Sequence, residues 1–226
     1  MIKDERMRAV YETVRCGVTV CDVGTDHAFI PIELILSGKS DKCIITDISA
    51  PSLEKGIKNA RNAACGNKIK AYCTNGTLDV PLDAQTDFII AGMGGELIVQ
   101  ILEQDSRLKD ENHRFVLQPM SKAEELRSYL AQNGFEVINE IKVESVGRIY
   151  PIINCKYTAK PYTLDYAELL LGFKKAQTEL EKRYAKRMAE QLTVKLNGVQ
   201  KSENHDKEQV KKLKEQIIAV NNAKKL

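Results

Sequence analysis

The sequence predicts an α/β fold in which a mainly parallel sheet is followed by a C-terminal helical hairpin. As far as residue 132, short apolar segments alternate with helical ones, a pattern typical of parallel strands joined by right-handed crossovers. The segments 135–145 and 149–157 look extended, and Gly147 lies between them as in an antiparallel hairpin. Beyond Pro161 the composition shifts to Lys, Glu, Gln, Ala and Leu. We therefore expect two domains, residues 1–160 and residues 161–226.

The elements of the first domain follow from local residue patterns. Apolar side chains at helical spacing predict a helix over 4–16, and β-branched residues predict the first strand over 18–23. Pro31 suits the first turn of the next helix. Because proline restricts the residue before it, we expect Pro119 to end the fifth strand and expose the Gln118 amide. The other expected elements are strands at 43–46, 69–73, 87–91 and 114–118 and helices at 31–37, 50–64, 95–104 and 121–132.

The second domain shows two helical stripes of apolar residues. The first repeats every four residues, and it consists of Leu180, Tyr184, Met188, Leu192 and Leu196. We expect a break at Asn197-Gly198, with polar residues through Asp206. The second stripe consists of Val210, Leu213, Ile217 and Val220. The two stripes predict antiparallel helices packed against each other, so any function of this domain would lie on its Lys/Arg faces.

Composition narrows the class of protein. The chain is 43% hydrophobic, and no segment approaches the roughly 18 apolar residues of a membrane span. The N-terminus has no signal-like apolar core, and the cysteines form no CxxC pair, so we expect reduced thiols, no metal site and a cytoplasmic protein with no membrane partner. The cysteines are at positions 16, 21, 43, 65, 73 and 155.

Charge is distributed unevenly along the chain. Residues 166–226 carry a balance of +6, whereas residues 1–165 carry −3. Such a basic appendage on an acidic body suggests a domain that meets a polyanion. A helical hairpin whose lysines are simply solvated would give the same balance, and charge alone leaves both interpretations open.

The first strand runs into an acidic turn, Asp22-Val-Gly24-Thr-Asp26-His27. Gly24 permits a tight bend, and a strand, a sharp turn and a helix N-terminus form the ligand-binding corner of a doubly wound sheet. A dinucleotide site would have glycines where this chain has Asp22 and Asp26, and these carboxylates would repel a pyrophosphate. They suit a ligand with a positive charge, hydroxyls or an amine, and S-adenosylmethionine has all three.

The next two strand ends also carry polar residues. Asp47 follows Asp22 by twenty-five residues and could accept both ribose hydroxyls, although an Asp here can equally form a turn or cap a helix. The segment Cys73-Thr74-Asn75-Gly76 is placed to touch an adenine edge, but Asn and Gly also make ordinary turns.

The fourth strand end, Ala91-Gly92-Met93-Gly94-Gly95, is rich in glycine. Such a loop leaves backbone N–H and C=O groups bare, so that a ligand can approach closely. Met93 could pack on a flat ring or fill the core. The Asn/Asp-Pro-Pro-aromatic signature of enzymes that methylate exocyclic amines is absent, which argues against amino-group chemistry.

Four motifs of this chain together resemble the TrmK family of bacterial tRNA (adenine(22)-N(1))-methyltransferases. They are Asp-Val-Gly-Thr-Asp-His-Ala at 22–28, Ala-Gly-Met-Gly-Gly at 91–95, Leu-Gln-Pro at 117–119 and Gly-Arg-Ile-Tyr at 147–150. The resemblance implies a class I (Rossmann-like) S-adenosylmethionine-dependent methyltransferase with a C-terminal coiled-coil hairpin. It also implies methyl transfer to N1 of an adenine in tRNA. The family usually has Gly-Asp-Gly-Leu where this chain has Thr74-Asn75-Gly76-Thr77-Leu78, and Asn75 can still hydrogen-bond an adenine amine.

The reaction that the resemblance implies suggests roles for particular residues. We expect Asp26 to stabilise positive charge on the target base, as the catalytic group, and His27 to orient it or contact the cofactor. The expected cofactor-binding residues are Asp22, Gly24, Asp26, His27, Asp47, Ile48, Asn75, Gly76, Ala91, Gly92, Met93 and Gly94. The expected tRNA-binding residues are Lys174, Lys175, Lys182, Arg183, Lys186 and Arg187. A methyltransferase for another acceptor and a non-catalytic S-adenosylmethionine-binding adaptor stay open as alternatives, as does a monomer or weak homodimer.

Overall fold

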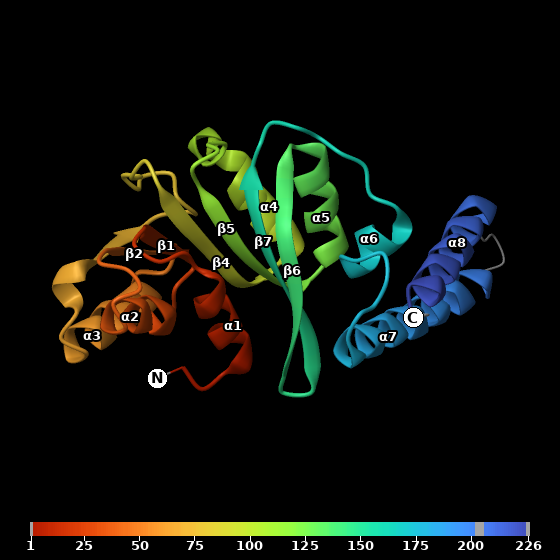
Figure 1. Cartoon of the computed structure of the whole chain (residues 1–226), viewed down its shortest axis with the longest axis horizontal. Helices are drawn as coiled ribbons and strands as arrows, with labels where there is room; N and C mark the ends of the chain where they lie inside the picture. The colour runs from red at the N-terminus through yellow and green to blue at the C-terminus, as the bar shows by residue number, and fades with distance from the viewer. Residues whose placement is uncertain (1, 202–205, 225–226) are drawn as a thin grey trace. The chain divides into compact units, whose positions relative to one another are not determined.

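The computed structural model of the chain describes residues 2–201 and 206–224 (Figure 1). The chain divides into two compact units, Met1–Pro161 and Tyr162–Leu226. Each unit has its own apolar core. The predicted α/β fold with a C-terminal helical hairpin is confirmed.

A seven-stranded sheet forms the centre of the first unit, in the order β3-β2-β1-β4-β5-β7-β6. The parallel strands are β1 (Thr19–Val23), β2 (Cys43–Asp47), β3 (Ile69–Cys73), β4 (Thr86–Gly94) and β5 (Arg114–Ser121). The antiparallel strands are β6 (Phe135–Ser145) and β7 (Arg148–Tyr157), joined by a tight turn in which Val146 and Gly147 have positive φ. The chain leaves β1 toward β2 and returns to β4 on the other side of β1, so the topological switch point lies between β1 and β4.

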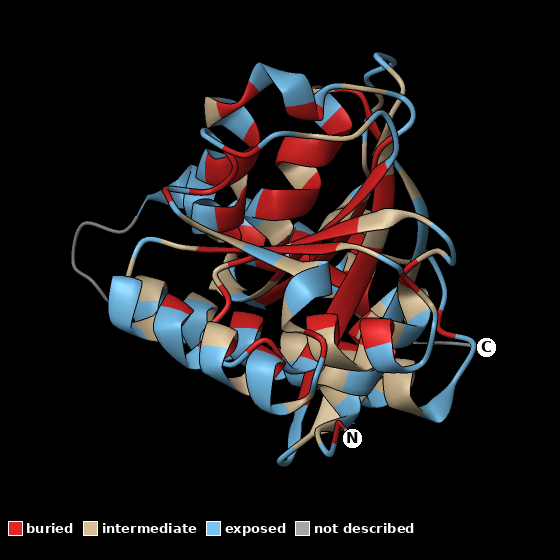
Figure 2. Cartoon of the chain, turned by 90° about the vertical axis from the view of Figure 1, so that its left-hand side faces the viewer, coloured by how far each residue is buried: buried red, intermediate tan, exposed pale blue. Residues whose placement is uncertain are grey.

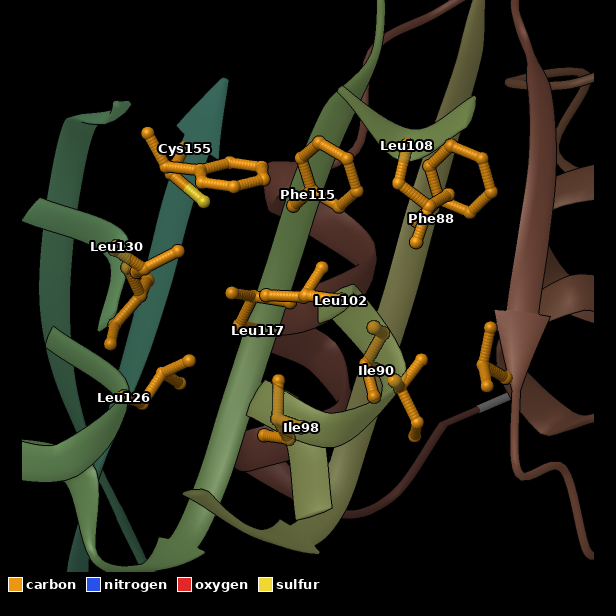
Figure 3. Close-up of a cluster of buried hydrophobic side chains, with 14 of the residues drawn as sticks. Phe88, Ile90, Ile98, Leu102, Leu108, Phe115, Leu117, Leu126, Leu130 and Cys155 are labelled. Carbon is orange, nitrogen blue, oxygen red and sulfur yellow. The ribbon is translucent and has the colours of Figure 1, made fainter. Parts of the chain in front are cut away.

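Helices cover both faces of this sheet (Figures 1 and 2). The helices are α1 (Glu5–Thr13), α2 (Phe29–Leu36), α3 (Ala50–Asn62), α4 (Gly95–Gln104) and α5 (Ala123–Gln132), with short 3-10 turns at Gly66–Lys68 and Ser106–Leu108. Alternate residues of β4 enter different cores: Phe88 and Ile90 pack with α4 and α5, as Figure 3 shows, and Ile89 packs with α1 and α2. Both faces are therefore buried, which explains the continuous apolar runs in the parallel strands.

Two predictions at the ends of strands are wrong. Strand β5 continues past Pro119 to Ser121, and Gln118 is fully buried rather than exposed. Pairing of β5 with β7 extends from Phe115 only to Leu117, so the missing N–H of Pro119 breaks no ladder on that side. The glycine-rich segment is not a loop either, because β4 continues to Gly94 with irregular register against β5.

The second unit consists of α6 (Tyr166–Leu171), α7 (Glu179–Gln200) and α8 (Lys207–Ala223). The Ala176 N–H donates to the Ala223 carbonyl at 2.8 Å, which places the start of α7 beside the end of α8 in an antiparallel hairpin. The predicted break at Asn197-Gly198 is wrong, because α7 continues through both residues. Gly198 is exposed, and packing of the neighbouring Leu196 and Val199 against the hairpin core offsets the cost of about 1 kcal/mol for glycine in a helix. Residues 202–205 of the expected polar connection lie outside the described residues.

Candidate active site

A cavity of about 290 Å³ lies at the switch point between β1 and β4. Asp22, Asp26 and His27 line it from the end of β1 and the turn that follows. Arg6 from α1 and Gln118 from β5 also contribute to the lining. Open α/β sheets bind their ligands at this place, beyond the carboxyl ends of the strands, so the cavity is the candidate active site.

The turn after β1 uses its backbone N–H groups within the fold. Gly24 has φ +77°, and the N–H groups of Gly24 and Thr25 both donate to the Thr46 carbonyl, at 2.8 and 2.9 Å. A pyrophosphate site needs such N–H groups to point at the ligand. The structure therefore adds a second reason, besides the acidic side chains, why this corner is not a dinucleotide site.

Asp22 is partly buried at the end of β1, and in the described part of the chain only the Thr25 hydroxyl donates to its carboxylate. Burial raises the pKa of Asp22 to about 7, although the Thr25 hydrogen bond lowers it. A ligand with a positive charge or with N–H and O–H donors would stabilise the ionised carboxylate. The geometry thus matches the amine-bearing ligand that the sequence predicts.

Asp26 lies at the exposed rim of the same cavity. Its two oxygens contact Lys55 Nζ and His27 Nε2, each at 3.0 Å. The hydrogen bond from Lys55 holds the pKa of Asp26 below its ordinary value, so the side chain stays a carboxylate at neutral pH. It is therefore available to interact with a positively charged group at the cavity mouth.

Met93 packs directly on the turn at Gly24. A Cβ atom on Gly24 would lie 2.0 Å from Met93 Cε, so a side chain at position 24 would displace Met93 as well as strain the backbone. Gly92 is exposed, but its N–H donates to Gln118 Oε1 at 3.1 Å and is not bare as predicted. Gly95 passes close to the next crossover, where a Cβ would lie 2.1 Å from the Lys122 carbonyl oxygen.

The other predicted cofactor residues lie along the same edge of the sheet, outside the residues that line the cavity. Asp47 Oδ1 accepts from the Ser49 N–H at 2.7 Å, the turn-forming role that the sequence left open. Ile48 is 74% exposed, and Asn75 is exposed at the end of β3. Asp47 pairs with Cys73, so the ends of β2 and β3 are neighbours. The structure thus brings Asp22, Gly24, Asp26, His27, Ala91 and Gly92 into one cavity and leaves Asp47, Ile48, Asn75, Gly76, Met93 and Gly94 beside it.

Sequence reasoning missed the group that holds the segment after β3. The Arg107 guanidinium donates to the carbonyl oxygens of Thr77, Leu78 and Val80 at 2.6, 2.9 and 3.0 Å. Asp105 accepts from Arg107 at 2.7 and 2.8 Å and so fixes its orientation. No sequence signal indicates this clamp, because its acceptors are backbone carbonyls about thirty residues away.

A second missed group ties α1 to the carboxyl ends of β4 and β5. Arg6 Nη1 donates to Gln118 Oε1 at 3.1 Å, and its guanidinium lies over the Tyr150 ring, 5.5 Å from the centroid. Gln118 and Tyr150 belong to two of the four motifs that resemble the TrmK family, Leu-Gln-Pro and Gly-Arg-Ile-Tyr. These motifs were the only indication in the sequence that the two residues lie near the site. The contacts give each motif a structural role at the wall of the cavity.

The predicted tRNA-binding residues fall into two groups in the second unit. Lys174 and Lys175 lie in the segment before α7, and the other four lie in its first turns. Lys174 is 3.4 Å from Glu168 and Lys182 is 2.6 Å from Glu179, whereas Lys175 and Lys186 are both exposed. Within residues 2–201 and 206–224, no helix is long and apolar enough to cross a membrane, and no group of three potential metal ligands occurs.

The comparisons with known proteins agree with this geometry. The methyltransferase domain family matches residues 3–153, and with the strand order and the acidic corner this defines a class I methyltransferase domain. A Mycoplasma genitalium protein named "Putative tRNA methyltransferase MG248" is 32% identical over 155 residues, 68% of each chain. The tRNA (adenine(22)-N(1))-methyltransferase of Bacillus subtilis is 29% identical over 66% of this chain and 63% of that protein. The chain belongs to the TrmK family.

One solved structure extends the likeness to the whole chain. It is a Streptococcus pneumoniae protein described as "a putative tRNA (m1A22) methyltransferase, in complex with S-adenosyl-L-methionine". The two chains superpose with a TM-score of 0.83 and 27% identity, covering 100% of each. The C-terminal helices of this chain therefore have counterparts in that protein.

Proposed function

We propose that this chain transfers a methyl group from S-adenosylmethionine to N1 of an adenine in tRNA, at position 22 by its likeness to the Bacillus subtilis relative. The observation that carries the proposal is the acidic corner at the switch point. There Asp22 has a single hydroxyl donor among the described residues, and the backbone N–H groups are already used. The names of the relatives support tRNA as the substrate, and a cytoplasmic location is part of the proposal.

The residues along this edge fit S-adenosylmethionine. We place Asp22 beside the cationic amino-acid end, Asp47 Oδ2 at the ribose hydroxyls, and Asn75 and Gly76 at the adenine edge. Oδ1 of Asp47 is taken by Ser49, and the Asn75 carbonyl accepts from Gln104 Nε2 at 3.1 Å, which leaves the Asn75 side chain for the ligand. The bound cofactor supplies a methyl carbon on a positively charged sulfur.

The chain itself needs no general base for this reaction. Neutral adenine N1 carries a lone pair and no proton, so the protein must align the base and accommodate the positive charge that develops on it. Alignment of this kind supplies up to roughly 7–11 kcal/mol in favourable systems. Asp26 is the group we assign to the developing charge, and contacts with Lys55 and His27 hold its carboxylate at the cavity mouth.

The second unit is the part of the chain that we propose binds the tRNA backbone. A base inside folded tRNA must be taken out of its pair or stack before N1 can react, which requires contacts to the surrounding backbone. The charge balance of +6 over residues 166–226 and the exposed Lys175 and Lys186 support phosphate binding there.

The test of the proposed function is methyl transfer from labelled S-adenosylmethionine to unmodified tRNA, followed by mass spectrometry of the nucleosides. The expected product is N1-methyladenosine, and it should disappear when adenine 22 is replaced by guanine. Cofactor binding without any transfer would favour the adaptor, and label in another nucleoside would favour a different acceptor atom.

The grip on tRNA is tested by Lys175→Gln with Lys186→Gln. The double variant should lower the slope of log K against log salt for tRNA binding by about 1–2 and leave cofactor affinity unchanged. Lys211→Gln with Lys214→Gln is the matched control, since both lysines are exposed on α8 and the charge change is the same. Equal effects of the two pairs would mean that net charge, and not this face, attracts tRNA.

A further inference from the structure

Phe29 is unusual among the aromatic residues of this chain. It is 49% exposed, and it is the only exposed phenylalanine or tyrosine in the part of the chain that the structure describes. Phe88, Phe115 and Phe135, in contrast, are fully buried. Phe29 begins α2 and lines the candidate active site. The fold gains little from a half-exposed ring at this position, so its placement calls for another explanation.

The Phe29 ring is held in a fixed arrangement with His27. Their centroids are 5.1 Å apart and the rings are inclined by only 17°, so they stack. His27 is itself fixed, since Nε2 contacts Asp26 at 3.0 Å and its carbonyl accepts from Asn59 Nδ2 at 3.0 Å. Both residues line the cavity, on either side of Ala28, whose φ of 57° turns the chain into α2. The result is a preformed aromatic surface at the cavity mouth.

We propose that the stacked Phe29–His27 pair is the platform on which the target adenine stacks when it enters the cavity. The inference rests on the proposed function, which requires a purine removed from its stack to lie near Asp26. A flat ring surface compensates such a base for its lost neighbours, and each stacked base contributes substantially to binding. The chain lacks an Asn/Asp-Pro-Pro-aromatic segment, so the aromatic surface must come from another part of the site.

The chemistry of the product also favours an aromatic face beside a carboxylate. Methylation of N1 makes the adenine ring cationic, and a cation over the face of a phenyl ring is attracted by its quadrupole. Asp26 contacts His27, so one carboxylate lies next to the platform. The same surface would therefore bind the neutral base by stacking and stabilise the charge that develops on it.

Phe29→Leu is the decisive variant, because it keeps an apolar side chain of similar volume and removes the ring. We expect kcat/KM for tRNA to fall about 10–100-fold, with the Kd for S-adenosylmethionine, measured by calorimetry, within twofold of wild type. Phe29→Tyr restores the ring and should recover most of the activity. Leu36→Ala, at the other end of α2 and 59% exposed, is the control for general damage to the helix.

Stacking itself is read by fluorescence of 2-aminopurine placed at the target position of tRNA, with S-adenosylhomocysteine present so that no transfer occurs. Removal of the base from the tRNA stack should raise the signal, and stacking on the platform should keep it lower in wild type than in Phe29→Leu. If kcat/KM and the 2-aminopurine fluorescence of Phe29→Leu equal those of wild type, the platform is wrong. A loss of cofactor affinity equal to the loss of activity would instead mean that Phe29 contacts the cofactor. Absence of N1-methyladenosine with wild type would contradict the proposed function. The fluorescence of wild type and Phe29→Leu can be compared whether or not methyl transfer occurs, so failure of the platform and failure of the proposed function are distinguishable.

Discussion

Two aspartates on the central strand pair of the sheet differ in what surrounds them. Asp87, near the amino end of β4, is fully buried and accepts from the Arg15 N–H and Nε, each at 2.8 Å. Arg15 Nη2 adds an ion pair at 2.6 Å. Asp22, at the carboxyl end of β1, has only the Thr25 hydroxyl among the described residues. Removing the partner of a buried charge destabilises the fold, whereas an under-paired carboxylate such as that of Asp22 keeps acceptor capacity that we propose a ligand uses.

The largest expected effect comes from Asp22→Asn, which removes the charge and keeps the shape. Cofactor affinity should fall at least about 100-fold because the cationic end of the ligand loses its ionised partner. Stability should move in the opposite direction. Ionising Asp22 at pH 8 costs the folded state about 1.4 kcal/mol for each unit by which its pKa is raised, so the ligand-free variant should gain about 2–4 kcal/mol. Calorimetry and urea unfolding at pH 8 measure the two quantities.

Asp87→Asn is the matched control at the other end of the same strands. It leaves Arg15 without its charged partner, so the free energy of unfolding should fall by about 2–4 kcal/mol. Cofactor affinity, measured well below the unfolding transition, should stay within twofold of wild type. If both aspartates changed affinity and stability in the same direction, the contrast between a structural and a ligand-binding carboxylate would be wrong.

A pair of glycines sharpens the same comparison. Gly17 precedes β1 and Gly24 follows it, with φ values of +74° and +77°. In both, alanine adds backbone strain of about 1–2 kcal/mol. Only Gly24→Ala also displaces Met93, so cofactor affinity should fall about tenfold in Gly24→Ala. It should remain unchanged in Gly17→Ala, where no atom of the described residues other than the adjacent ones lies within 4 Å of the new Cβ. Adding Met93→Ala to Gly24→Ala should bring the cofactor affinity close to that of Met93→Ala alone, and an affinity still well below that of Met93→Ala would mean that backbone strain is responsible.

The regular elements could be predicted because each carries its own periodicity. The expected strand over 69–73 and helix over 95–104 agree with β3 and α4 to the residue. Contacts between segments that are distant in the sequence decide the strand and helix ends that the local patterns predicted wrongly. Gln118 is buried, and its carboxamide oxygen accepts hydrogen bonds from the Gly92 N–H and the Arg6 guanidinium. Both donors lie far from Gln118 in the sequence. Likewise, α7 passes through Asn197-Gly198 because packing of the second helix outweighs a local propensity.

The candidate site was predictable to the extent that its residues follow strands. Strand ends identified the acidic corner, because carboxyl ends of parallel strands meet at one edge whatever their order. The order itself, and hence the switch point between β1 and β4, could not be read from the sequence. The exposed ring of Phe29 was equally invisible, since an apolar residue at the start of a helix is normally read as core.

The pH dependence of cofactor binding tests Asp22 without a variant. With a pKa of about 7 in the free protein, about one molecule in eleven is ionised at pH 6 and most are at pH 8, so affinity should rise about tenfold between them. Stability should run the other way. The folded state binds more protons than the unfolded state between the unfolded value of 3.8 and about 7, so the ligand-free protein loses stability as pH rises through that window. In Asp22→Asn both dependences should flatten.

The smallest effect is expected at Arg107, whose guanidinium holds backbone carbonyls of the segment that follows β3, next to the proposed adenine contacts. Arg107→Gln removes the donors to Thr77, Leu78 and Val80, so the Asn75 segment should become less ordered and the KM for S-adenosylmethionine should rise about three- to fivefold. At saturating cofactor, kcat should be unchanged, because the clamp does not touch the acceptor side. Lys42→Gln is the control, since Lys42 makes a comparable 2.6 Å contact with Asp83 at the amino edge of the sheet and should leave KM unchanged. A fall in kcat with constant KM would instead place the effect of Arg107 on the chemical step.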